Sequence, residues 1–182
     1  MYTQIEIETH FDGKLKIAYL NQPETYNSLN KVLLQELKNF IVACNEDENV
    51  RCVALSGRGK AFCSGQNLKE ALSLGNVEEE RVIQKMVVDY YNPLVEEIAN
   101  CQKPVDSLVN GPAVGAGAML ALICDICLAT ENSYFSQAFV NIGLIPDTGW
   151  TYWLPKLVGR QQAKYLAFTG KKLSANDALK LG

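Results

Sequence analysis

The sequence contains a single histidine, His10, in a chain of 182 residues. One histidine argues against a His-based metal site and against a Ser-His-Asp triad. No apolar run reaches the roughly 20 residues that a membrane helix needs. The start of the chain has neither the cationic residues nor the apolar stretch of a signal peptide. We therefore expect a cytoplasmic protein without a membrane segment or a metal, and place His10 at the surface or at a strand end.

An excess of basic residues is also absent, since 17 Lys and Arg face 20 Asp and Glu, for a formal net charge of -3. Nucleic acid and anionic membranes attract cationic surfaces, so neither is an expected partner. The six cysteines stand mostly in apolar segments, as buried free thiols do. Cys124 and Cys127 have the spacing of a redox motif, but within a strand their sulfurs would point to opposite faces. We expect neither a redox nor a metal role for them.

Apolar periodicity predicts an α/β fold, with residues 1–182 forming a single domain. The expected order is a hairpin (3–10 and 15–20), a helix (29–42), a strand (50–56), a helix (77–101), a strand (105–109), a helix from Gly115, a strand (123–130) and helices after Pro146. Such alternation favours a largely parallel sheet covered by helices. Pro93 is expected to kink or split the second helix, because proline cannot donate to the helical ladder.

Two expected strand-to-helix junctions, at residues 60–68 and 110–118, are rich in small residues. Glycines let a ligand approach the backbone, and free N–H groups at a helix start favour negative charge. If the two loops face one another, they could form an oxyanion hole; alternatively, small residues only permit tight packing. A dinucleotide-binding fingerprint does not fit, because its third glycine would fall at Leu120. The segment 57–60 lacks the spacing of a phosphate loop.

Taken in order along the chain, these loops resemble the enoyl-CoA hydratase/isomerase (crotonase) family. Further matching segments are 21–29, Cys124-Asp125-Ile126 and 142–146. The resemblance implies a spiral of β-β-α units, truncated here before the C-terminal helices of the family, and assembly as a homotrimer or a dimer of trimers. It implies an acyl-CoA thioester as substrate, so that coenzyme A is part of the substrate and no separate cofactor is expected.

The resemblance also implies the site residues. The backbone N–H groups of Gln66 and Ala116 would form the oxyanion hole, where the identity of the side chain is not decisive. Contacts with substrate or coenzyme A are expected from Ser64, Gly65, Asn67, Leu68, Gly115, Met119 and Phe139. Arg58 and Lys60 are better explained as a solvated charged loop than as ligands of the coenzyme A phosphates.

The identity of one acidic residue favours isomerisation within the family. Met119 and Phe139 match the positions where a prototype hydratase carries its two carboxylates, and neither can move a proton. Asp147 matches the single acid/base of isomerase-type members, and one carboxylate suffices to move a proton between two carbons. Apolar neighbours such as Trp150 would exclude water and raise the pKa of Asp147. Asp147 could alternatively be the N-cap of a helix starting at Thr148.

We therefore predict an acyl-CoA isomerase that shifts a double bond through an enolate, with Asp147 as acid/base. Its substrate would be an enoyl-CoA of fatty acid metabolism or a ring-epoxide phenylacetyl-CoA of phenylacetate degradation. The alternatives are an enoyl-CoA hydratase-like enzyme of fatty acid oxidation and a non-catalytic CoA-ester binding protein. An aryl-CoA dehalogenase would need a histidine base, for which His10 is badly placed.

Overall fold

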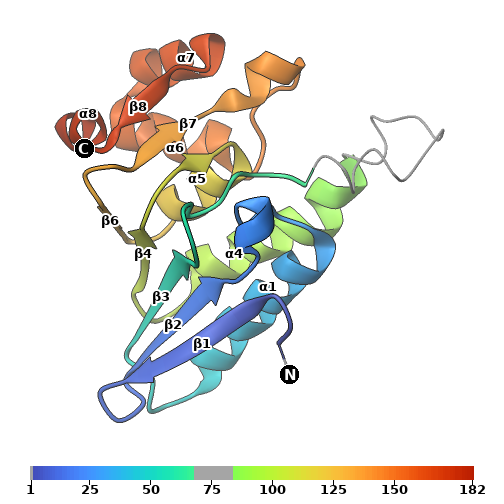
Figure 1. Ribbon diagram of the computed structural model, residues 1–182, viewed down its shortest axis with the longest axis vertical. Coiled ribbons are helices and arrows are strands. Elements are labelled where there is room, and N and C mark those ends of the chain that lie inside the picture. The colour runs from blue at the N-terminus through green and yellow to red at the C-terminus, as the bar shows by residue number, and fades with distance from the viewer. Residues whose placement is uncertain (1, 68–83) are drawn as a thin grey trace.

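A computed structural model describes residues 2–67 and 84–182. Its main sheet has five strands in the order β1-β2-β3-β4-β6 (Figure 1). The strands are β1 (Ile5–His10), β2 (Leu15–Leu20), β3 (Cys52–Gly57), β4 (Val105–Val109) and β6 (Ile126–Ala129). β1 pairs antiparallel with β2, and the remaining pairs are parallel. The hairpin and the largely parallel sheet predicted from the sequence are therefore confirmed.

Two helices, α1 (Lys31–Glu46) and α4 (Asn92–Asn100), pack together on one side of this sheet (Figure 1). The side chain of Asn30 caps α1 by accepting a hydrogen bond from the N–H of Leu33 at 2.9 Å. The buried face of α1 consists of Leu33, Leu34, Leu37, Phe40, Ile41 and Cys44. Val32 follows the same helical spacing of apolar residues but is 48% exposed.

The second long helix, expected at residues 77–101, lies partly outside the described residues. Its described part contains a π-helical turn, η2 (Val87–Tyr91), in which the N–H of Asn92 donates to the carbonyl oxygen of Val87. This turn directly precedes α4 and Pro93. Pro93 has no N–H to donate, and its ring would clash with the carbonyl four residues back in a regular α-helix. The helix therefore deviates next to Pro93, where the sequence predicted a kink or a break.

A second sheet of three short strands was not predicted. It consists of β5 (Ala113–Val114), β7 (Tyr134–Ser136) and β8 (Lys172–Ser174), in the order β5-β7-β8. Strands of two or three residues are too short to display an alternating pattern. The helices α5 (Ala116–Leu122), α6 (Trp150–Val158), α7 (Arg160–Thr169) and α8 (Ala175–Leu181) lie around it, with short 3-10 turns at η1 (Pro23–Thr25) and η3 (Ala138–Ile142) (Figure 1).

The strand expected at residues 123–130 begins only at Ile126, because Ile123 still caps α5. Cys124 therefore precedes the strand, and the predicted strand geometry of the two cysteines was wrong. Both thiols are free, and that of Cys124 donates to the carbonyl oxygen of Leu120 at 3.3 Å. Asp125 has a structural contact, accepting a hydrogen bond from the N–H of Val105 at 2.8 Å.

The buried side chain of Asn27 supports the loop that follows β3, up to residue 62. Its side chain is fully buried, and its backbone adopts a positive φ of 56°. Its amide nitrogen donates to the carbonyl oxygens of Arg58, Ala61 and Phe62, and its amide oxygen accepts from the N–H of Gln22. Only a group with both donor and acceptor atoms satisfies this set.

Asn27→Asp is expected to destabilise the protein by about 3–5 kcal/mol, because a buried carboxylate would face carbonyl oxygens instead of donating to them. Aspartate tolerates the same left-handed backbone, so the substitution changes the chemistry of the side chain alone. The free energy of unfolding in urea measures the effect. Asn39→Asp, on the exposed side of α1, is the control. Equal stability of the two variants would contradict the role given to Asn27.

Within the described residues, every helix is too short or too polar to cross a membrane. The same part of the chain contains no group of three or more His, Cys, Asp or Glu side chains placed to hold a metal ion. His10 lies at the end of β1, with its ring Nε2 3.2 Å from a carboxylate oxygen of Glu8.

Candidate functional site

The two glycine-rich loops lie side by side. The N–H of Val114 donates to the carbonyl oxygen of Cys63 at 2.9 Å, and the N–H of Cys63 donates to that of Pro112 at 3.2 Å. A Cβ atom on Gly117 would lie 2.5 Å from the carbonyl oxygen of Cys63. Small residues are therefore needed for this close packing, as the simpler interpretation of the sequence held. The same packing also places the loops face to face.

In the first loop, the peptide between Gly65 and Gln66 is held by its carbonyl group. The carbonyl oxygen of Gly65 accepts a hydrogen bond from the N–H of Leu29 at 2.7 Å, and the N–H of Asn67 donates to the carbonyl oxygen of Leu29 at 2.9 Å. In a trans peptide the C=O and N–H groups point in opposite directions. The N–H of Gln66 is therefore directed away from Leu29, and it donates to no group within residues 2–67 and 84–182.

The second loop holds the peptide between Gly115 and Ala116 in the same way. The carbonyl oxygen of Gly115 accepts hydrogen bonds from the N–H groups of Ala118 and Met119, at 3.1 and 3.2 Å. The N–H of Ala116 consequently points out of the first turn of α5, and no described group accepts a hydrogen bond from it. Gly115 has φ 55° and ψ -126°, a conformation that glycine adopts readily.

The two amides belong to segments in direct contact. A Cβ atom built on Gly65, whose φ is 89°, would lie 2.8 Å from the carbonyl oxygen of Val114 and 3.7 Å from the nitrogen of Ala116. A cavity of about 230 Å³ opens next to this contact. Its described lining consists of Ser64, Gly65, Gln66, Met86, Val87, Tyr91, Val114, Gly115, Ala116, Ala138, Phe139, Asn141, Ile142, Leu144 and Asp147. Most of the residues expected at the site therefore share one cavity.

Of the expected site residues, two do not line the described cavity and a third lies outside the described residues. Met119 is fully buried in the core, with the side-chain nitrogen of Gln137 at 3.7 Å from its sulfur. Asn67 supports the first loop through its backbone bond to Leu29. Neither lines the described cavity. Leu68 lies outside the described residues.

Asp147 is half-buried and lines the cavity. Its Oδ1 accepts a hydrogen bond from the hydroxyl of Thr148 at 2.7 Å. Burial raises the pKa of the Asp147 carboxyl, and hydrogen bonds from Thr148 and from its own backbone partly oppose this change. The predicted direction of the pKa shift is confirmed. Trp150, expected as an apolar neighbour at the site, is buried in the core and does not line the described cavity.

The interpretation of Asp147 as a helix N-cap was wrong. The helix α6 begins at Trp150 with Gly149 in the capping position, and no side chain accepts a hydrogen bond there. Asp147 contributes only its backbone carbonyl, which accepts from the N–H of Trp150 at 2.9 Å. Thr148 has a φ of 52°, an unusual conformation for a β-branched residue. Strained backbone of this kind is often found at functional sites, and here it immediately follows the carboxylate.

Sequence reasoning missed Tyr91, which is only 3% exposed and lines the cavity. The apolar residues of the expected helix at 77–101, including Met86, Tyr90, Leu94 and Ile98, recur at regular helical spacing and predict Tyr90 on the inner face. In the structure the π-helical turn makes Tyr91 the buried residue instead. The buried residues Met86 and Tyr91 are five apart, a spacing that a regular α-helix does not produce on one face. Pro93 was the available signal, because it marked the place where the period could change.

Arg58 forms ion pairs on the surface and does not line the described cavity. Its guanidinium lies 2.7 Å from a carboxylate oxygen of Glu6 and 3.6 Å from the ring centre of Tyr19. It also pairs with Glu8. The expectation of a charged surface loop is confirmed for this residue. Its partners are on the N-terminal hairpin.

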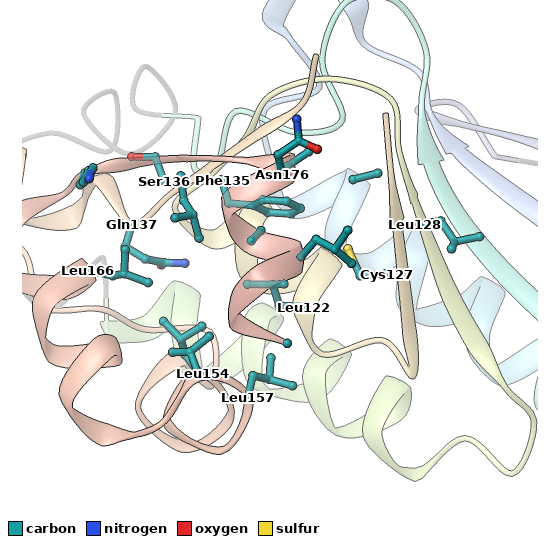
Figure 2. A pocket seen from close by; sticks show the side chains of 18 of the residues that line it. Leu122, Cys127, Leu128, Phe135, Ser136, Gln137, Leu154, Leu157, Leu166 and Asn176 are labelled. Carbon is teal, nitrogen blue, oxygen red and sulfur yellow. The ribbon is translucent and has the colours of Figure 1, made fainter. Parts of the chain in front are cut away.

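A second cavity, of about 450 Å³, lies among β6, β7, α6, α7 and α8 (Figure 2). Leu122, Leu154, Leu157 and Leu166 surround it together with Phe135, as Figure 2 shows. Its described lining includes neither Asp147 nor the glycine-rich loops. The chemistry expected from the sequence therefore belongs to the smaller cavity.

A mixed α/β fold with two paired glycine-rich loops beside one carboxylate is the arrangement of crotonase-fold proteins. The model of the family described as enoyl-CoA hydratase/isomerase matches residues 13–182. The chain belongs to this family.

Relatives and solved structures agree with this membership. The chain is 39% identical to a 1,2-epoxyphenylacetyl-CoA isomerase of Escherichia coli K12, over 97% of this chain and 67% of that protein. It is 36% identical to a crotonyl-CoA hydratase of Syntrophomonas wolfei, over 94% of this chain and 64% of that protein. The crystal structure of an enoyl-CoA hydratase from Bacillus anthracis superimposes with a TM-score of 0.90 at 34% identity, covering 99% of this chain and 68% of that one. The chain thus spans about two thirds of the length of these relatives.

Proposed function

We propose that the protein is an acyl-CoA isomerase that shifts a carbon–carbon double bond, with Asp147 as the acid/base. The observation that carries this proposal is the position of a carboxylate with a raised pKa in the cavity that also contains Gln66 and Ala116. Asp147 is the one carboxylate among the described residues lining that cavity.

The two amides fit the charge that such a reaction creates. Removal of a proton beside a thioester carbonyl moves negative charge onto the carbonyl oxygen. Preorganised N–H donors stabilise this charge most where they have no competing partner. The N–H groups of Gln66 and Ala116 have no partner within the described residues, and their peptides are held by bonds to the opposite carbonyls. Reorganisation during the reaction is therefore small.

Asp147 would act twice in one turnover. Its carboxylate takes a proton from C2 of a 3-enoyl-CoA, and the electron pair of that C–H bond delocalises over C2, C4 and the thioester oxygen. The same carboxyl group then returns the proton to C4, which leaves a double bond between C2 and C3. A raised pKa suits this role, because the group must both accept and donate the proton near neutral pH.

Hydration is the main alternative, since one relative named above is a crotonyl-CoA hydratase. The prototype reaction needs two carboxylates to hold and activate a water molecule. Met119 is enclosed in the core and Phe139 lines the cavity, and neither can transfer a proton. The apolar lining also disfavours a held water. A CoA-ester binding protein without activity would not require a half-buried carboxyl group at residue 147, whose ionised form is disfavoured by desolvation.

Incubation with a 3-enoyl-CoA tests the proposal directly. We expect ultraviolet absorbance from the conjugated 2-enoyl thioester to appear in proportion to the protein added. A 2-enoyl-CoA should keep its conjugation, because no water is added to it. Rapid loss of that absorbance would identify a hydratase instead. Binding without turnover of a 3-enoyl-CoA or of a ring-epoxide phenylacetyl-CoA would favour a binding protein.

A further inference from the structure

Tyr91 connects the π-helical turn to the first glycine-rich loop. Its hydroxyl donates a hydrogen bond to Oε1 of Gln66, and both residues line the cavity. Tyr91 is almost fully buried, so its position is determined by packing against the core. This contact acts on the same residue whose backbone amide was assigned to the oxyanion hole.

The side chain of Gln66 is a potential competitor for that oxyanion hole. It carries a carbonyl oxygen that can accept hydrogen bonds, and it lies in a cavity with two N–H groups that have no partner in the described chain. Within residues 2–67 and 84–182, its own amide nitrogen makes one long contact, at 3.4 Å, to the carbonyl oxygen of Asn67. The bond from Tyr91 is thus the stronger constraint on where Oε1 points.

We propose that Tyr91 is a positioning residue for the oxyanion site, a role that rests on the proposed function. Its hydroxyl retains Oε1 of Gln66 on the side of the π-helical turn. The carboxamide oxygen is thereby kept from accepting hydrogen bonds from the amides of Gln66 and Ala116. It is also kept from facing the enolate oxygen, which would repel it. Both effects leave the two amides available to the substrate.

The π-helical turn gives this contact its geometry. The buried residues here are Met86 and, five positions later, Tyr91. The next buried residues, Leu94 and Ile98, follow at regular helical spacing. In an uninterrupted α-helix, five residues correspond to about 500° of rotation, which would carry residue 91 about 140° away from the direction of residue 86. The extra residue of the turn brings the phenol back to the cavity side. Single π-helical turns occur frequently at functional sites.

The test combines Tyr91→Phe with Gln66→Met in a double-mutant cycle. The first change removes only the hydroxyl, and the second removes the competing carbonyl while retaining length and the backbone amide. We expect Tyr91→Phe to lower kcat for 3-enoyl-CoA about 10-fold with KM within about 2-fold, less than the roughly 10²–10³-fold that loss of an oxyanion donor causes. In the Gln66→Met background, Tyr91→Phe should change kcat less than about 2-fold, because no competing oxygen remains.

A second measurement does not depend on turnover. The infrared carbonyl stretch of bound butyryl-CoA, a saturated thioester, should move to lower frequency in the wild type and move less in Tyr91→Phe. An equal loss of kcat in both backgrounds, or an unchanged carbonyl shift in Tyr91→Phe, would overturn the positioning role. If wild-type protein binds butyryl-CoA with no carbonyl shift, the oxyanion site itself is wrong. A normal shift without isomerisation would refute the proposed reaction while the role of Tyr91 could still be decided.

Discussion

Asp147→Asn is expected to lower the rate of 3-enoyl-CoA isomerisation by about 10²–10⁴-fold, the range that a general acid/base contributes. Asparagine has nearly the same shape but cannot accept and return the proton. The two backbone amides remain, so the affinity for a saturated acyl-CoA should stay within a few-fold of wild type. Initial rates from ultraviolet absorbance and dissociation constants from calorimetry separate the two effects.

In wild type, kcat/KM should rise with pH as Asp147 loses its proton, at a pH above the usual range of an aspartate because burial raises its pKa.

The stability of the same variant provides an independent check. Because burial raises the pKa of Asp147 in the folded state, the folded protein binds this proton more tightly than the unfolded chain. Wild-type stability should therefore fall as pH rises from the unfolded pKa, about 3.9, through the raised folded pKa. Asp147→Asn lacks this loss and should be the more stable protein at neutral pH, with the difference shrinking as the pH falls toward 4.

The control for both measurements is Asp89→Asn. Asp89 lies on the π-helical turn but is exposed and does not line the described cavity. We expect wild-type rates and stability for this control. Full activity in Asp147→Asn would remove Asp147 from the mechanism. Lost activity together with lost stability would mean that Asp147 supports the fold instead of the reaction.

Gly65→Ala is expected to reduce isomerisation by about 10²-fold or more, comparable with the loss of one oxyanion donor. The new methyl group would lie 2.8 Å from the carbonyl oxygen of Val114, a backbone atom that cannot move without shifting the second loop. Residue 65 also has a φ of 89°, which alanine rarely adopts. The loops should separate, so that the N–H groups of Gln66 and Ala116 can no longer both donate to the same substrate oxygen.

Gly159→Ala separates backbone strain from the steric clash. Gly159 also has a positive φ, of 78°, but no atom lies within 4 Å of a Cβ built there, and it lines neither cavity. This control should lose stability and keep its activity. The infrared shift of bound butyryl-CoA should decrease in Gly65→Ala and persist in Gly159→Ala. Equal activity of the two variants would show that close packing at Gly65 does not position the oxyanion site.

Sequence reasoning was most successful where local composition carries the information. The hairpin and α1 follow from apolar periods of two and 3.6 residues that extend over six or more residues. The small residues of both loops were recognisable because only glycine permits their positive φ values and close contacts. Asp147 was identified from its resemblance to family members, and the structure adds the burial that raises its pKa.

The errors arise where a residue's environment depends on segments distant in the sequence. Val32 has the correct helical period but is exposed, so the period of α1 alone does not decide which of its apolar positions are buried. β5, β7 and β8 exist because they pair with one another, and none has enough residues to show a strand period alone. Met119 was expected at the site from the family resemblance, and only the structure shows that it is buried in the core and outside the described lining of the cavity.

The sequence by itself determined the α/β order of elements, the two glycine-rich junctions and the presence of a single candidate acid, because these properties reside in residue type and spacing. Only the tertiary structure decided which loop amides have no partner within the described residues, how Asp147 is desolvated, and that Tyr91 instead of Tyr90 reaches the cavity. Those outcomes depend on hydrogen bonds and packing between Leu29, the loops and the π-helical turn. Such contacts form only after distant segments have come together, so no local pattern in the chain encodes them separately.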